Sequence, residues 1–367
     1  MWMMSSSAKA TLRDAPDAAA LIALSARVGA DPLLVKGPGG NTSLKQDGVM
    51  WVKASGAALA DAARRDIFVP LDVAALRAAL ANDDPACETS LAFVPARLNA
   101  SGLRPSIEAT MHALLPQRIV VHVHCVATIA AAIRAEPVPF LQEHLAGLDW
   151  IFVPYRRPGL PLTQAIRERL QPETRVLVLG NHGLVVAGDC VGDCAALLTD
   201  VQARLERAAR DGAAQPALPV SIAPLDTATL SGLARGTDYA PADDPAVHAL
   251  ALRPIRLAQA ASGSLYPDHV IFLGPSVEVL TPGETLARKL ALAAPGPQRL
   301  VLVPDRGALM PRAASRTARA MARCLADVLA RVAPGMEPNT LSTEDEAALL
   351  NWDAEKYRQS RNRDSTQ

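Results

Sequence analysis

The spacing of apolar and polar positions predicts helices and strands that alternate along most of the chain. Residues 17–30 place apolar side chains at helical intervals behind an acidic start, which is typical of an amphipathic helix. Residues 72–82 and 190–210 follow the same pattern. The β-branched run from Arg118 to His124 is the clearest strand in the sequence. We therefore expect an α/β protein.

Glycine, proline and serine mark further boundaries in the first half of the chain. A glycine-rich loop is expected from Lys36 to Lys45, followed by a strand over 49–56. Residues 104–115 predict a helix opened by Pro105 and Ser106. Another helix is expected over 127–134, and 175–188 predicts two strands around a turn at Gly180–Gly183.

The second half is less regular. Residues 211–223 mix Gly, Ala and Pro and predict a linker. Residues 269–280 and 298–305 are expected to contain strands, each near helical sequence. The last helix is expected to end within 349–359, with a frayed polar tail behind it. No repeat of solenoid period occurs.

Length and charge narrow the range of functions. At ~150 residues per domain, 367 residues predict about two domains. Lys+Arg and Asp+Glu both number 37, so no basic excess favours a nucleic-acid or acidic-membrane partner. No apolar run reaches the ~18–20 residues of a membrane span. Met1 to Ala10 lack the order of a signal peptide, and the five cysteines form no CxxC pair, so we expect reduced thiols and a cytoplasmic protein.

His122 and His124 are candidate metal ligands. Side chains alternate between the two faces of a strand, so residues two apart project to the same side. The alternative is a half-buried pair that hydrogen-bonds to its neighbours, and this spacing alone does not distinguish the two.

His182 and Glu108 favour the metal site. His182 lies in the tight Gly180–Gly183 turn, and Glu108 lies on the helix just before the HxH strand. Three imidazoles with a displaceable fourth ligand are typical of a catalytic zinc site. Such an ion can polarise a carbonyl and stabilise the enediolate left by C–C cleavage, while the carboxylate moves the proton.

A second candidate site is the segment from Gly37 to Ser43, GPGGNTS. Glycines let backbone N–H groups approach an oxyanion, although an ordinary turn explains the segment equally well. The sequence has neither the P-loop ending nor GxGxxG. Ser55, Gly56 and Ser106 could add donors, and Lys36 and Lys53 could add positive charge unless they are ordinary solvated lysines.

Four ordered segments over roughly residues 15–212 resemble the class II aldolase/adducin family, which includes fuculose- and rhamnulose-phosphate aldolases and ribulose-phosphate 4-epimerase. The segments are GxxGNxS (Gly37, Gly40, Asn41, Ser43), SG (Ser55, Gly56), SIExxxH…HxH (Ser106, Glu108, His112, His122, His124) and NHG (Asn181, His182, Gly183).

The resemblance implies a three-layer α/β/α fold with a largely antiparallel central sheet, and a homotetramer. It implies that zinc or another divalent metal binds His122, His124 and His182, with Glu108 as the catalytic residue and as a further metal ligand that substrate can displace. Phosphate would bind at the residues that match the family's phosphate site, and His112 is interpreted as structural. Those matching residues are Gly40, Asn41, Ser55, Gly56 and Ser106.

Two departures and one missing part qualify the resemblance. Ile107 replaces a small hydroxyl residue, and Lys53, included here as substrate-binding, replaces an uncharged one. Both features are closer to the aldolase half of bifunctional rhamnulose-phosphate aldolase/dehydrogenase proteins. Residues 213–367 contain no GxGxxG after a strand, so we expect a smaller C-terminal α/β domain of unassigned role. The family's late catalytic tyrosines match none of Tyr239, Tyr266 and Tyr357.

The leading hypothesis is a metal-dependent aldolase acting on a small sugar, a sugar phosphate or a related ketose. An epimerase, dehydratase or decarboxylase using the same metal-enolate chemistry is the first alternative. A non-catalytic adducin-like interaction module is the second, although the intact histidine and glutamate set speaks against it. Neither the substrate nor the native metal follows from the sequence.

Overall fold

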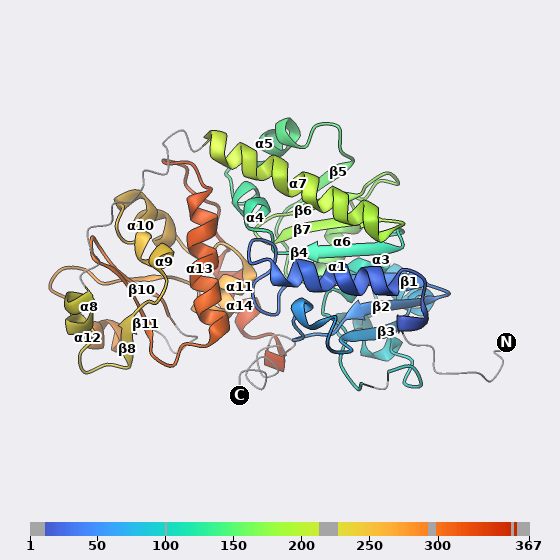
Figure 1. The fold of residues 1–367 in the computed structure, drawn as a ribbon, viewed down its shortest axis with the longest axis horizontal. Helices are drawn as coiled ribbons and strands as arrows, with labels where there is room; N and C mark the ends of the chain where they lie inside the picture. The colour runs from blue at the N-terminus through green and yellow to red at the C-terminus, as the bar shows by residue number, and fades with distance from the viewer. Residues whose placement is uncertain (1–11, 100, 213–226, 293–298, 354–355, 358–367) are drawn as a thin grey trace.

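The computed structural model describes residues 12–99, 101–212, 227–292, 299–353 and 356–357. It contains two β-sheets with helices around them, and the first sheet lies in the N-terminal half (Figure 1). Short 3-10 turns accompany this half: η1 (Leu12–Asp14), η2 (Leu59–Asp61), η3 (Pro85–Glu88) and η4 (Leu91–Phe93).

The first sheet has seven strands in the order β3-β2-β1-β4-β7-β6-β5. Every neighbouring pair is antiparallel except β5–β6, which is parallel. This confirms a largely antiparallel central sheet. The strands are β1 (Asn41–Gln46), β2 (Val49–Lys53), β3 (Phe68–Asp72), β4 (Ile119–Val123), β5 (Trp150–Val153), β6 (Val176–Leu179) and β7 (Gly183–Gly188).

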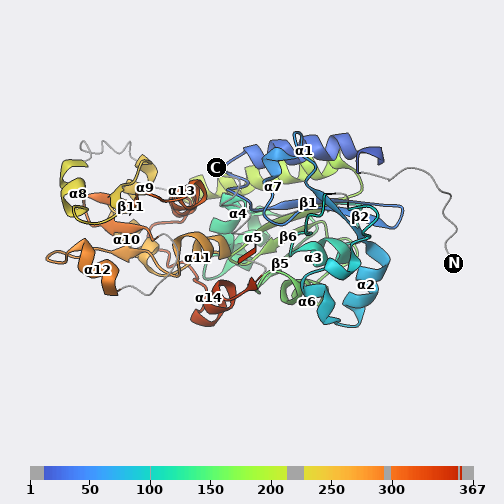
Figure 2. The ribbon, with the colours of Figure 1, turned by 90° about the horizontal axis from the view of Figure 1, so that it is seen from below.

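Helices cover both faces of this sheet (Figure 2). Along β4, Val121 and Val123 pack into one hydrophobic cluster while Val120 packs into another, as the two-residue period of a strand requires. One face carries α1 (Ala18–Ala30), α4 (Val126–Ala132), α5 (Pro137–His144) and α7 (Val191–Gly212), and the other α2 (Val73–Ala81), α3 (Ala109–Leu114) and α6 (Leu160–Arg167). The three-layer α/β/α prediction is confirmed.

The C-terminal region has a second sheet of four strands, in the order β8-β11-β10-β9, so the predicted additional α/β part is confirmed. Its strands are β8 (Tyr239–Pro241), β9 (Glu278–Val279), β10 (Val301–Val303) and β11 (Gly307–Pro311). Its helices are α8 (Thr227–Leu233), α9 (Pro245–Ala249), α10 (Pro254–Ala261), α11 (Pro267–Leu273), α12 (Leu286–Leu292), α13 (Arg316–Ala330) and α14 (Thr343–Leu350).

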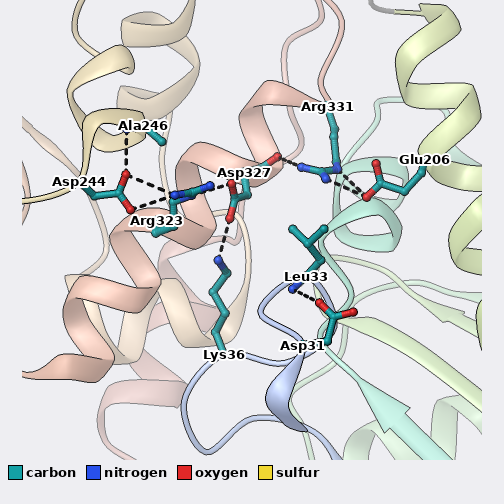
Figure 3. A network of polar contacts seen from close by, with 9 residues as sticks. All are labelled: Asp31, Leu33, Lys36, Glu206, Asp244, Ala246, Arg323, Asp327 and Arg331. Carbon is teal, nitrogen blue, oxygen red and sulfur yellow. Dashed lines mark hydrogen bonds and ion pairs between the residues drawn. The ribbon is translucent and has the colours of Figure 1, made fainter. Parts of the chain in front are cut away.

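The C-terminal region packs directly on the first half through apolar and charged contacts. Val126, Ile129 and Ile133 from α4 and its end share one hydrophobic cluster with α11 and α13. Two ion pairs cross the same interface at 2.7 and 2.8 Å, as Figure 3 shows: Lys36 Nζ with Asp327 Oδ2, and Arg331 with Glu206. Because residues of both parts share this core, a division at residues 212 and 213 stays a prediction.

Most predicted elements are confirmed within one or two residues, although the strand expected over 49–56 ends at Lys53, and three others were wrong in part. Asn41 to Gln46 form strand β1 rather than loop, because Asn41–Leu44 pair with β4 in the middle of the sheet. The helix expected over 104–115 begins only at Ala109, since Pro105 bridges to Ala54. Residues 269–273 are helical, since Pro267 begins α11 at its first turn.

Some predictions fall on residues outside the described ranges. These are the segment 1–10, most of the expected linker (213–223), Gln298 and the polar tail 361–367. Within the described ranges, no helix is both long enough and apolar enough to cross a membrane.

Candidate functional site

Three imidazoles meet at one end of the central sheet. His122 and His124 come from the end of β4, and His182 comes from the turn that joins β6 to β7. Because β4 pairs with β7, with His122 opposite Val185, this turn lies beside the end of β4. The three ring centroids are 4.9–5.1 Å apart. One ligand atom of each residue lies within 4.8 Å of the others, so the group could hold a metal ion.

Hydrogen bonds determine which nitrogens face this point. Nδ1 of His122 is 3.0 Å from the carbonyl oxygen of Leu184, and Nδ1 of His124 is 2.8 Å from Oδ2 of Asp268. A carbonyl and a carboxylate only accept, so each Nδ1 donates a proton. When such a ring is uncharged, its Nε2 carries a lone pair, which is what a metal ion requires.

Glu108, the residue just before α3, faces the imidazoles. Its Oε2 is 3.4 Å from Nε2 of His122, and its Oε1 is 3.4 Å from Nε2 of His182. These distances exceed a normal hydrogen bond, and neither Glu108 Oε1 nor His122 Nε2 has a hydrogen-bond partner among the described residues. An imidazole lone pair and a carboxylate thus face each other without a proton between them, and this arrangement suits a cation.

The protonation states agree with a cation site. Burial lowers the pKa of His122 to about 4 and the pKa of His182 to about 3, so both rings are neutral at pH 7. Burial alone raises the pKa of the Glu108 carboxyl, but the histidines in their protonated forms at low pH and the N–H from Asn41 outweigh it and hold this pKa at about 2. With the rings neutral, a metal ion is the group that would supply the positive charge.

A buried chain of polar side chains holds Glu108 in place. Nδ2 of Asn41 donates to Oε2 of Glu108 at 2.7 Å, and Oδ1 of Asn41 accepts from Nε2 of His112. Nδ1 of His112 accepts from the hydroxyl of Ser43 at 2.7 Å. Burial keeps the pKa of His112 well below its ordinary value, so the ring is neutral and has one donor and one acceptor. His112 thereby orients the amide of Asn41 and does not line the site.

One pocket brings together most of the predicted site residues, while His122 is fully buried and absent from its lining. Gly40 lets the glycine-rich loop lie close to the backbone of His122. Its φ is +66°, and a Cβ there would lie 2.9 Å from the carbonyl oxygen of His122. The predicted residues in the lining are Gly40, Asn41, Lys53, Ser55, Gly56, Ser106, Glu108, His124 and His182.

The two candidate lysines, Lys53 and Lys36, have different surroundings in the structure. Lys53 is in the lining, and its ammonium donates to the carbonyl oxygens of Pro38 and Ala57, both at 2.8 Å, so it joins the two loops on which these residues lie. Lys36 is absent from the lining and forms a buried ion pair with Asp327, so it is neither a charge of this pocket nor the solvated lysine that was the alternative.

The sequence analysis missed the C-terminal residues of the pocket. Pro267 and Asp268 belong to its lining, and Asp268 is bonded to His124. No motif marks Asp268, and its contact with His124 spans 144 positions, so no local pattern could have found it. None of the described tyrosines lines the pocket.

The N-terminal half of the chain is similar to known proteins. The family model for the "Class II Aldolase and Adducin N-terminal domain" matches residues 19–209, slightly more than half of the chain. A curated relative in Bacillus subtilis (strain 168), the uncharacterised oxidoreductase YuxG, is 31% identical over 179 residues, or 46% of this chain. The match covers only 26% of that relative's own length.

Two solved structures align with the same half of the chain. One is the N-terminal class II aldolase domain of a conserved protein from Thermoplasma acidophilum, with 26% identity, 56% of this chain, 99% of that chain and a TM-score of 0.47. The other is the L-fuculose-1-phosphate aldolase of Thermus thermophilus, with 18% identity, 54% of this chain, 97% of that chain and a TM-score of 0.36.

Replacing His122 with alanine should weaken divalent-metal binding by more than about 100-fold, since loss of a ligand exceeds the roughly 10–100-fold effect of an outer contact. Competition with a chromogenic chelator on zinc-loaded protein measures this. His144, a half-buried histidine against Phe140, provides the control, and its alanine variant should bind metal normally. Equal affinities in His122→Ala and the wild type would exclude His122 as a ligand.

Proposed function

Since the chain belongs to the class II aldolase and adducin family, we propose that it is a divalent-metal-dependent lyase of the aldolase type. The observation that carries this proposal is that Glu108 and His122 face each other without a proton between them, beside two further imidazoles. In this proposal His122, His124 and His182 hold zinc or another divalent ion, and Glu108 is the acid/base residue.

A divalent ion bound there supplies Lewis-acid stabilisation of the negative charge that develops on a substrate carbonyl oxygen when a C–C bond breaks. Glu108 would take a proton from the adjacent carbon or return one to it, and its low pKa keeps the free carboxyl ionised. Asn41 holds the Oε2 atom, while Oε1 has no hydrogen-bond partner among the described residues and faces Nε2 of His182 at 3.4 Å. The oxygen that transfers the proton is therefore assigned to Oε1.

The other end of the pocket would bind an anionic group of the substrate. Gly40 and Gly56 expose backbone, and Ser55 and Ser106 place hydroxyls in the same lining. The Ser106 hydroxyl also accepts from Asn41 Nδ2 at 3.2 Å and from the backbone N–H of Glu108 at 3.2 Å. This links the anion-binding end to the acid/base residue, so a bound phosphate would orient the reacting carbon beside Glu108.

The same site suits an epimerase, dehydratase or decarboxylase, because each begins with charge on a carbonyl oxygen beside the metal. A screen of ketose phosphates and unphosphorylated keto acids, with zinc, manganese or cobalt added, separates them by product: retro-aldol cleavage releases an aldehyde and a second carbonyl compound, decarboxylation releases CO2, dehydration releases water, and epimerisation keeps the substrate's mass. An adducin-like binding module would show no metal uptake after zinc reconstitution. The oxidoreductase name of YuxG is not extended to this chain, which matches a quarter of that protein.

The proposal includes a division near residues 212 and 213, a homo-oligomer and a cytoplasmic location. The family resemblance supports the first two, and light scattering would test the tetramer that it implies. All five cysteines are free thiols, and this is the composition that a reducing compartment preserves.

Glu108→Gln should keep the metal and lose turnover by about 10²–10⁴-fold, because the amide occupies the same volume but transfers no proton. Metal content by elemental analysis and kcat on the substrate found in the screen measure the two effects. Exposed Glu143→Gln is the matched control and should retain full turnover. A fully active Glu108→Gln protein would rule out the assigned role.

Ser55→Ala should raise KM for a phosphorylated substrate by about 10-fold or more, as expected for loss of a hydrogen bond to a charged group. KM for the same ketose without phosphate should not change, and exposed Ser262→Ala should leave both values as they are. An equal rise for both substrates would argue against anion binding at this end.

A further inference from the structure

The C-terminal region approaches the candidate metal site through the start of α11. Asp268 lies in the first turn of this helix and is 1% exposed. Its Oδ2 accepts from Nδ1 of His124 at 2.8 Å. A buried carboxylate is costly unless it is well paired, so this contact is a built feature of the site.

The contact has a definite consequence for His124. With Nδ1 donating to Asp268, the ring presents Nε2 to the point shared with His122 and His182. A carboxylate that accepts from the second nitrogen of a ligating histidine fixes the ring orientation and makes the first nitrogen a stronger ligand. His122 receives the equivalent contact from a backbone carbonyl, but His124 depends on a side chain from outside the family-matched half.

The glycine-rich loop leaves room for this pair. A Cβ at Gly39 would lie 2.9 Å from Nδ1 of His124 and 3.3 Å from Oδ2 of Asp268. A side chain at this position would therefore push the imidazole away from the carboxylate. The absence of a side chain here is a second observation that points to the same contact.

The turn that carries His182 is also tied to the C-terminal region. Nδ2 of Asn181 donates to the carbonyl oxygens of Leu265 at 3.1 Å and Asn339 at 2.8 Å. Asn181 has a φ of 51°, so its backbone conformation and its side-chain contacts together define the turn. Two of the three candidate ligands thus depend on contacts made by the C-terminal region.

We infer that the C-terminal region completes the metal site, with Asp268 as the positioning residue for His124. This rests on the proposed metal-binding function and deepens it, because it assigns the C-terminal region a role within the same site. The first half of the chain would then hold metal weakly without Asp268, even though it contains all three candidate ligands.

The test measures two properties of the full chain and compares them between the wild type and its variants. These are the affinity for zinc, by chelator competition, and the visible absorption spectrum after cobalt substitution. Asp268→Ala should weaken zinc binding by about 10–100-fold and change the cobalt spectrum, as loss of an outer carboxylate does. Asp268→Asn keeps an oxygen acceptor in the same place and should recover part of the affinity. This variant also provides the answer if the alanine protein does not fold.

Glu206→Ala is the matched control, because it removes a carboxylate that pairs with Arg331 across the same interface but away from the pocket. It should leave both the zinc affinity and the cobalt spectrum unchanged. Wild-type affinity and spectrum in Asp268→Ala would overturn the inference, as would an equal loss in Glu206→Ala. A wild-type protein that binds no zinc or cobalt would instead overturn the proposed function, and this inference with it.

Discussion

The candidate site depends on lone pairs of buried nitrogen and oxygen atoms that face one another without a proton between them. The neutral His122 presents the lone pair of Nε2 to Oε2 of Glu108 at 3.4 Å, and Glu108 extends its other oxygen to His182. Acceptors buried face to face repel each other and are desolvated, so they persist only if the surroundings hold them or a cation joins them. Here packed surroundings hold them, and the three imidazoles could also hold a divalent ion between them.

The fold supplies that rigidity from three directions. The central strands β1 and β4 pair so that Asn41 lies opposite His122, and this register places the amide of Asn41 on Glu108. Neutral His112 fixes the orientation of that amide by a hydrogen bond to its oxygen. Helix α11 brings Asp268 to His124. A seven-stranded sheet covered on both faces is a suitable scaffold, because its packed core allows little movement at the strand ends where the candidate ligands lie.

The sequence predicts the ligand-bearing parts well because their signals are local. The two-residue period of a strand places His122 and His124 on one side, and the glycine turn marks His182. Glu108 follows from the ordered family motif. The failures have physical reasons too. Residues 269–273 form an apolar run without a helical period, and only Pro267 indicates that a helix begins there. Thr42 and Ser43 are polar yet lie in a buried strand, since their hydroxyls bond to Ser25 and His112. Asp268 meets His124 only after both halves of the chain fold together.

The most direct test of this account is anomalous X-ray diffraction at the zinc edge, on crystals of the full chain grown with zinc. The account predicts one strong peak within bonding distance, about 2.0–2.1 Å, of Nε2 in both His122 and His124 and of a ring nitrogen in His182. Strong peaks only elsewhere on the protein, or an ordered site with no peak between the three imidazoles, would contradict it.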